Sequence, residues 1–366
     1  MPTLQQIKQQ KQQLIADYSQ ACNLTALWQI INTLTPIIIV WLLVARYAAT
    51  SIWIVIATIP VLTLFTLRML VLMHECGHGS LFNSQRINIV IGFILGVMTG
   101  MPQFVWSQHH DYHHANNGNW DKYRGPLTSP SISEFATLTA AQRRSYLLVR
   151  HIAMAPLGGF VYLLFNPRFT WLKGSVSLLV HLVRAKFKQP ELSLKAHAAT
   201  FKTRYWQSSQ QYWHMFWNNV VLMAAWTVMS WSIGADLFFT VYVISVSLAG
   251  GAGIMLFTVQ HNFEHAYASG STEWDYDKGA VDGTSFLVLP RWLNWFTANI
   301  GYHHIHHLSA KIPNYRLAKC HHECEHLFVD VRRIRLMEIP YALTCLIWDA
   351  AAQRIISVAE FQRRQR

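Results

Sequence analysis

Most histidines of this 366-residue chain fall in a few short clusters. Three are HECGH at 74–78, HHDYHH at 109–114 and HHIHH at 303–307, and a looser group, HNFEH, lies at 261–265. Imidazole is the commonest metal ligand in proteins and suits iron, copper and zinc. Because one zinc takes about four ligands, these histidines are enough for two metals, and too many for one, if they converge in space.

The spacing within each cluster places the candidate ligands on one face of a helix. Side chains three or four residues apart lie one turn apart on the same face. His109 and His304 fall on other faces, which makes them weaker candidates. The candidate metal ligands are therefore His74, His78, His110, His113, His114, His261, His265, His303, His306 and His307.

Long apolar segments supply the elements that must position these histidines. Apolar residues make up 52% of the chain and charged residues only 13%, against about 25% charged in soluble proteins. A bilayer span needs about 20 mostly apolar residues, and four segments come near this: 28–44, 52–73, 216–233 and 237–259. Because the links within each pair are short, the sequence predicts an all-α membrane protein with four transmembrane helices in two hairpins, and Arg68 snorkelling to the interface.

The remaining segments predict structure outside the spans. The Gly-rich stretch 87–105 is typical of a re-entrant or interfacial segment, and 146–164 is similar but interrupted by proline and glycine. Segment 170–212 alternates basic and apolar residues, which favours an amphipathic helix lying on the membrane surface. Residues 1–27 form a polar, amphipathic N-terminal segment, and 339–366 an amphipathic tail.

The order of spans and histidine clusters predicts that every cluster lies on one side of the membrane. The cluster at 74–78 follows the end of the second span, and the group at 261–265 follows the end of the fourth. No span separates His261 from the cluster at 303–307. The segments carrying the histidines also hold nearly all Lys and Arg, which places them in the cytoplasm. The net charge of +12 then indicates a membrane-facing surface or a dock for an acidic partner, rather than nucleic-acid binding. The five scattered cysteines predict no disulfide framework.

Three other readings of these residues compete with a two-metal centre. HECGH fits the HExxH motif of zinc proteases, with Glu75 as general base, but that reading leaves the other clusters unexplained. The run CHHECEH at 320–326 could bind zinc, although it lacks a clear second ligand pair. A metal transporter would carry ligands within its spans, whereas these histidines lie at the span ends.

At these residues the chain resembles the integral-membrane fatty acid desaturases. The family pattern is HxxxH, HxxHH and HxxHH on a cytoplasmic helical cap over a four-span bundle. The flanks HECGHGS, VQHNFEH and NIGYHHIHHLSAKIPNYRL look similar too, the last most like bacterial acyl-lipid desaturases of the Δ12 (omega-6) type. The resemblance implies a desaturase domain over 28–338 in a bacterial inner membrane, with two non-haem irons held by the eight histidines of the three boxes and a further ligand from His261 or His265.

The chemistry that this resemblance implies is O2-dependent removal of two hydrogens from a long acyl chain. No fused haem domain is evident, so electrons would come from a separate ferredoxin or small haem cytochrome, and the substrate would be a membrane lipid or an acyl thioester. The same scaffold could instead hydroxylate the chain or oxidise another hydrocarbon. Glu75, Asp111, Asp121 and Glu264 lie beside the clusters and could each fix the tautomer of a ligating histidine. A narrow apolar tunnel would set the double-bond position.

Overall fold

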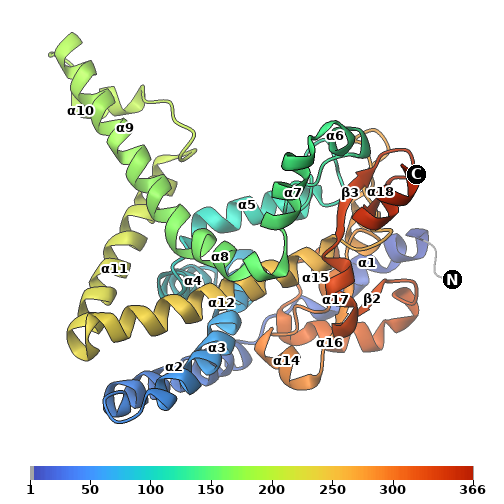
Figure 1. The fold of residues 1–366 in the computed structure, drawn as a ribbon, viewed down its shortest axis with the longest axis horizontal. Helices are drawn as coiled ribbons and strands as arrows, with labels where there is room; N and C mark the ends of the chain where they lie inside the picture. Colours follow the sequence, from blue (N-terminus) through green and yellow to red (C-terminus); the bar gives the residue numbers. More distant parts are fainter. Residues whose placement is uncertain (1–3, 366) are drawn as a thin grey trace.

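Long helices dominate the computed structural model, which describes residues 4–365 (Figure 1). Four of them come in two consecutive pairs whose members contact each other: α2 (Asn23–Tyr47) with α3 (Ile52–His78), and α11 (Ser209–Ile233) with α12 (Ala235–His261). Gly79 ends α3 in the left-handed conformation with φ of 68°, and its N–H bonds back to the last turn. The first cluster therefore forms the rigid end of α3, as the spacing predicts.

Three of these helices are long and apolar enough to cross a membrane, and α11 is not among them. Within the described residues these are α2, α3 and α12, with up to five spans if each of two bent helix pairs counts as one. In α11, Asn218 and Asn219 interrupt the apolar run, and their side-chain oxygens each accept a hydrogen bond of 2.8 Å from Arg168. A mostly helical membrane protein is confirmed, while the count of four spans stays a prediction.

Two segments expected outside the spans are bent helix pairs. Helices α4 (Gln85–Thr99) and α5 (Gln103–Asn116) meet at 102°. Gly100 makes this bend possible, with φ of 83°. The bend turns α5, which carries the second cluster, away from the apolar α4 towards α3 and the cap.

The second bent segment leads into an arm that extends away from the body (Figure 1). Helix α7 (Ala140–Val149) precedes a nearly continuous helical run from Ile152 to Lys188, and the two meet at 60°. This run contains η1 (Ile152–Met154), α8 (Ala155–Phe160), a π-helical turn η2 (Val161–Phe165) and α9 (Asn166–Lys188), and α10 (Leu194–Ala199) follows. Apolar residues at helical spacing are exposed along α9, among them Phe169, Leu172, Val176, Leu179 and Val183. The expected position of this helix on the membrane surface stays a prediction.

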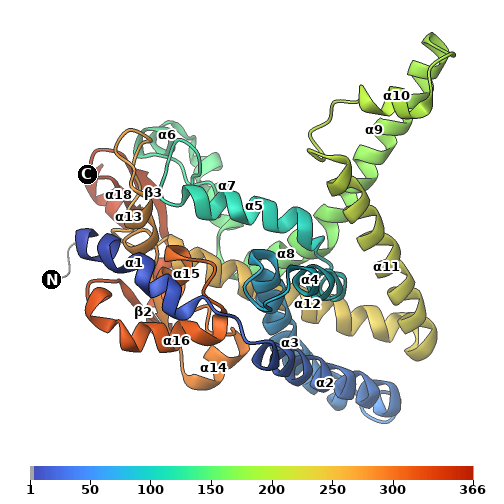
Figure 2. The ribbon, with the colours of Figure 1, turned by 180° about the vertical axis from the view of Figure 1, so that it is seen from behind.

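The rest of the chain forms a cap at the ends of α3, α5 and α12. Helix α1 (Leu4–Tyr18) lies along the cap (Figure 2) and buries Ile7, Leu14 and Tyr18 against it. Strand β1 (Phe286–Val288) pairs in parallel with β2 (Arg333–Arg335), and β3 (Cys345–Asp349) pairs antiparallel with β4 (Arg354–Ser357). The other cap elements are α6 (Ile132–Thr137), α13 (Tyr276–Val281), α14 (Arg291–Phe296), α15 (His303–Leu308), α16 (Asn314–Glu323), η3 (Glu325–Leu327), η4 (Leu336–Glu338), α17 (Ile339–Ala342) and α18 (Val358–Arg364).

Two local expectations differ from the structure. Segment 339–366, expected as an amphipathic tail, includes the hairpin β3–β4, and Ile347, Ile356 and Phe361 are buried in the cap. Arg68 does not snorkel, because it is 2% exposed. Its Nε donates to Thr33 Oγ1 over 2.9 Å, and its guanidinium lies 3.9 Å from the Trp295 ring centre and bonds to the carbonyl of that residue. A charge that finds such partners inside the protein need not reach the interface.

Candidate metal centre

Five histidines from three helices converge in a first group. Their ligand-capable atoms all lie within 4.8 Å of one another. Close Nε2–Nε2 approaches join His74 to His78 at 3.2 Å, His110 to His114 at 3.0 Å, and His114 to His306 at 3.1 Å. The group contains His74 and His78 from α3, His110 and His114 from α5, and His306 from α15.

Four buried histidines form a second group beside the first. They are His113 from α5, His261 from the end of α12, and His303 and His307 from α15. The Nε2 atoms of His303 and His261 are 2.9 Å apart, and those of His113 and His307 are 3.2 Å apart. Because α5 and α15 each supply both groups, the two groups share their supporting helices.

The geometry of the nitrogens fits two metal ions. Nitrogens bound at right angles to one metal at about 2.1 Å lie about 3 Å apart, which matches the 2.9–3.2 Å separations. Packing so many Nε2 atoms against each other in a buried space leaves each without an ordinary hydrogen-bond donor, which is costly. A cation at the centre of each group would satisfy all of them.

Carboxylate oxygens lie close to histidine Nδ1 atoms of the first group but not of the second. Buried Glu75 places Oε1 3.1 Å from His74 Nδ1, and Asp111 places an oxygen 3.3 Å from His78 Nδ1. The structure therefore places these two acids beside candidate ligands, and their role in fixing a tautomer stays a prediction. The other two acids have different partners: Asp121 accepts the N–H of Ser271 over 2.8 Å, and Glu264 interacts with Tyr341. Among the described residues the Nδ1 atoms of His113, His303 and His307 in the second group lack a partner. The carboxylates beside the first group make the two sites differ in charge.

Comparisons with known proteins agree with this arrangement. The family model for fatty acid desaturases matches residues 49–336. The chain is 30% identical to a fatty acid desaturase of Bacillus subtilis (strain 168) over 359 residues, which cover 97% of this chain and 93% of that protein. The chain belongs to the fatty acid desaturase family. This desaturase is therefore a membrane oxidoreductase that acts on acyl substrates.

More distant relatives include plant desaturases with different printed specificities. The desaturase is 23% identical to a chloroplastic omega-6 fatty acid desaturase of Spinacia oleracea, over 75% of this chain and 55% of that protein. It is 24% identical to an endoplasmic-reticulum omega-3 fatty acid desaturase of Vigna radiata var. radiata, over 69% of this chain and 59% of that protein.

The third cluster of the desaturase is kept neutral by its surroundings. Burial holds the pKa of the His303, His306 and His307 imidazoles well below its ordinary value, and neighbouring histidines lower it further. Neutral imidazole is the form that binds metal. The buried site thus selects the protonation state that ligation requires.

This neutrality predicts acid sensitivity in the metal-free desaturase. The unfolded chain takes up protons on these imidazoles below about pH 6.5, whereas the folded chain keeps the imidazoles neutral to a lower pH. The unfolded state then binds more protons, so the free energy of unfolding falls as the pH decreases below that value. Thermal unfolding at pH 7.5 and 5.5 should show a lower Tm at pH 5.5, and an unchanged Tm would contradict the prediction.

Three further histidines lie away from the two groups. His265 is exposed, with φ of 69°, and its Nδ1 is 2.7 Å from the Arg354 guanidinium. His109 is exposed, and buried His304 turns to the other side of α15, where its Nε2 lies 3.1 Å from His321 Nδ1. In the described part of the chain, 320–326 gathers no third group of potential ligands. The structure therefore leaves His261, and not His265, at the centre.

Replacing His265 by alanine should have little effect. The exposed ring can be removed without opening a cavity, so metal content and product yield should stay within about twofold of wild type. Iron analysis and product quantification check this. A large loss of iron in His265→Ala would return His265 to the ligand set.

An apolar cavity of about 270 Å³ reaches the histidines. His74, His110 and His303 line it, so it touches both groups. The rest of its wall is mainly apolar and comes largely from α3, α5, η2 and α12 and from the turn between α4 and α5. It includes Val71, Met101, Trp106, Tyr162, Leu163, Ile254 and Phe257. The sequence predicts a narrow tunnel but does not identify its lining, because these residues share no motif.

Aromatic side chains connect this cavity to the ligands. The Trp106 indole stacks on the His110 ring with centres 4.7 Å apart and planes at 12°, and it donates its N–H to the Tyr162 hydroxyl over 2.9 Å. Phe257 packs against the rings of His113 and His261, with centres 4.9 and 5.0 Å apart. These contacts cover the cavity side of the histidine rings and restrict their orientation.

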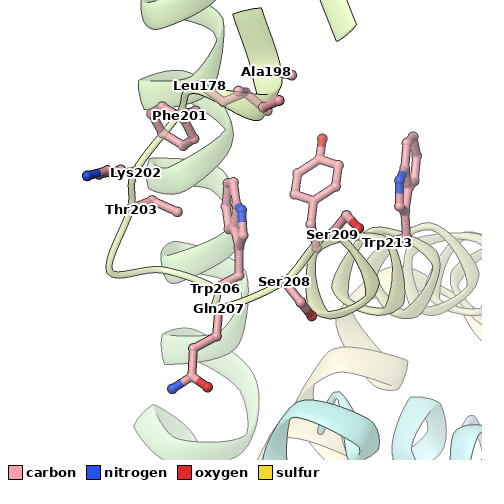
Figure 3. Close-up of a pocket in the computed structure, with 12 residues that line it drawn as sticks. Leu178, Ala198, Phe201, Lys202, Thr203, Trp206, Gln207, Ser208, Ser209 and Trp213 are labelled. Atoms are coloured by element: carbon pink, nitrogen blue, oxygen red, sulfur yellow. The ribbon is translucent and has the colours of Figure 1, made fainter. Parts of the chain in front are cut away.

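A second hollow of about 580 Å³ lies apart from the histidines, between α9 and the start of α11 (Figure 3). Trp206 stands between the two helices in this hollow, and the Lys202 ammonium points away from it (Figure 3). None of the residues lining it is a histidine or a carboxylate. It therefore plays no part in the metal centre.

Proposed function

We propose that this chain is an O2-dependent desaturase that inserts a double bond into a long acyl chain at a di-iron centre, with Δ12 (omega-6) regiochemistry. The observation that carries this proposal is the pairing of two histidine groups with one apolar cavity. Five and four ligand nitrogens respectively lie in two adjacent groups, and the cavity that touches both has an apolar wall. A methylene chain in this cavity would lie against both groups.

The chemistry explains why metals are needed. Unactivated C–H bonds are beyond acid–base side chains, so a cofactor must supply the hard step. Two bound irons, which imidazole ligands suit, would supply the activation of O2 for removal of the hydrogens. The reaction converts –CH2–CH2– to –CH=CH– while O2 takes up four electrons and four protons to give two waters. Two of each come from the substrate. The other two protons come from solvent, and the other two electrons must come from a separate donor, a ferredoxin or small haem cytochrome.

The residues of the chain bind, orient and shield. Apolar side chains such as Val71, Leu163 and Ile254 hold the acyl chain and exclude water from it. Trp106 and Phe257 fix the ligand rings on the cavity side, and Glu75 fixes the tautomer of His74 from the opposite side. Holding the substrate in one pose is what distinguishes one double-bond position from another.

The spans and the cap also have an expected orientation in the membrane. We infer that α11 is the fourth span, that the cap faces the cytoplasm of a bacterial cell with the spans in the inner membrane, and that 28–338 forms the catalytic domain. Supporting this, Gly234 alone connects α11 to α12, and the two helices contact each other. The omega-6 preference rests on the flanks of the third box and on the name of the spinach relative.

A zinc protease built on HECGH finds no support in the geometry. Its general base would have to face a substrate, but the Glu75 side chain is fully buried and bound on both oxygens: Oε1 to His74, Oε2 to the Asn314 N–H over 2.8 Å and to the Ser80 hydroxyl over 3.1 Å. Glu75 is therefore a buried hydrogen-bond acceptor that connects these residues.

The deciding experiment is expression in a host that lacks the product, with mass spectrometry of its lipids and location of the double bond. The proposal expects a new double bond at the Δ12 or omega-6 position and close to two irons per purified chain. A hydroxylated acyl product would show that the enzyme is a hydroxylase and not a desaturase. A double bond elsewhere would overturn the regiochemistry alone, and zinc with no lipid change would overturn the whole proposal.

A further inference from the structure

Gly250, Gly251 and Gly253 lie close together in α12, and the first two have a packing reason. A Cβ on Gly251 would lie 2.7 Å from the backbone of Ala155, and one on Gly250 would lie 2.8 Å from Gly159 Cα. Such distances are closer than van der Waals contact. These two glycines let α8 approach α12 closely.

Gly253 has no such reason. A Cβ built there meets nothing within 4 Å, and its φ does not lie in the left-handed region. Glycine inside a helix weakens that helix relative to alanine, so local stability does not favour it either. Gly253 lines the cavity, and the space beside it is open.

The position of Gly253 places this space along the path from the histidines. Gly253 precedes Phe257 by one turn and His261 by two turns of α12, about 12 Å along the helix axis at about 1.5 Å per residue. Phe257 packs on the ring of His261. An acyl chain lying against the histidines and following α12 would therefore pass Gly253 several methylenes away from the reacting carbons.

We propose that Gly253 is a specificity-determining residue, whose missing side chain admits the part of the acyl chain lying beyond the metal centre and so sets the chain length that the enzyme accepts. This inference rests on the proposed acyl-chain desaturation. Any side chain at 253 would occupy space that the substrate needs, whereas the fold itself has room for one. A larger residue should shorten the accepted chain without disturbing the centre.

The test compares Gly253→Ala and Gly253→Leu with Ala252→Leu, a matched control that adds bulk at the adjacent α12 position outside the residues lining the cavity. Each variant is expressed as the full chain in the same host, and product chain lengths, iron content and Tm are measured. One methylene in an apolar pocket changes selectivity by about 10- to 200-fold. We expect Gly253→Leu to lower product from the longest chains by at least about tenfold relative to shorter ones, and Gly253→Ala to shift it less.

The controls separate this inference from the function on which it rests. Gly253→Leu should keep wild-type iron content and a Tm close to wild type, and Ala252→Leu should keep the wild-type chain-length profile. An unchanged profile in Gly253→Leu, or an equal shift in Ala252→Leu, would overturn the role of Gly253. Absence of any new double bond with the wild-type chain would instead overturn the proposed function.

Discussion

Replacing His306 by alanine is expected to abolish double-bond formation and to lower the iron content of the purified chain. His306 is the only residue of α15 in the first group, and its Nε2 lies 3.1 Å from that of His114. Loss of a residue that merely hydrogen-bonds a ligand typically costs about 10- to 100-fold in metal affinity or activity, so loss of a ligand should cost more than about 100-fold. Lipid mass spectrometry and metal analysis measure both effects.

His304→Ala is the matched control for this substitution. His304 is equally buried, on the same short helix, and bonds to His321 instead of to either group. Its removal should lower the free energy of unfolding by about 1–3 kcal/mol, because the His321 nitrogen loses its partner, while the surviving protein keeps its iron. Equal loss of iron in both variants would show that α15 was disrupted rather than that His306 binds metal.

Substituting Glu75 should have the second-largest effect, because one carboxylate joins a candidate ligand to the cap. It accepts from His74 Nδ1 on one oxygen, and from the Asn314 N–H and the Ser80 hydroxyl on the other. In Glu75→Gln the amide must place its NH2 towards one side. If the NH2 faces Asn314, two donors oppose each other. If it faces His74, it favours the His74 tautomer that carries its proton on Nε2, and that tautomer cannot bind metal through Nε2.

Glu75→Gln should therefore lower metal affinity by about 10- to 100-fold. Glu75→Ala should in addition lower the free energy of unfolding by several kcal/mol, at about 1–3 kcal/mol for each buried donor left unpaired. Iron titration and chemical denaturation separate the two effects. Asp111→Asn is the control, because its carboxylate is 59% exposed beside His78, where water can replace it. An equal loss of iron in Asp111→Asn would contradict the special role of Glu75.

The difference between the two groups follows from these contacts. Glu75 and Asp111 place carboxylates beside the five-histidine group only. Negative charge near a metal favours its higher oxidation state, so the two irons of the proposed centre would differ in redox potential. This asymmetry adds to the difference in the number of histidines, which is five in one group and four in the other.

The sequence alone determined the features that depend on local backbone geometry. Spacings of three and four residues place His110, His113 and His114 on one side of a helix whatever surrounds them, and the structure has α5 there. Apolar length likewise identified α2, α3 and α12 as membrane helices. The histidine pattern also identified the family, because chemistry constrains the types and spacing of ligands more tightly than packing constrains apolar residues.

Only the tertiary structure decided which histidines meet. His113 and His114 are adjacent in sequence yet belong to different groups, because neighbouring side chains on a helix diverge by about 100° and α15 approaches α5 between them. His265 has the same spacing from His261 as His78 has from His74, but α12 ends at His261 and the chain turns, so the helical pattern no longer applies at His265. The cavity, the partners of Arg68 and the space beside Gly253 arise where helices distant in sequence pack together, and local periodicity carries no information about those crossing angles and contacts.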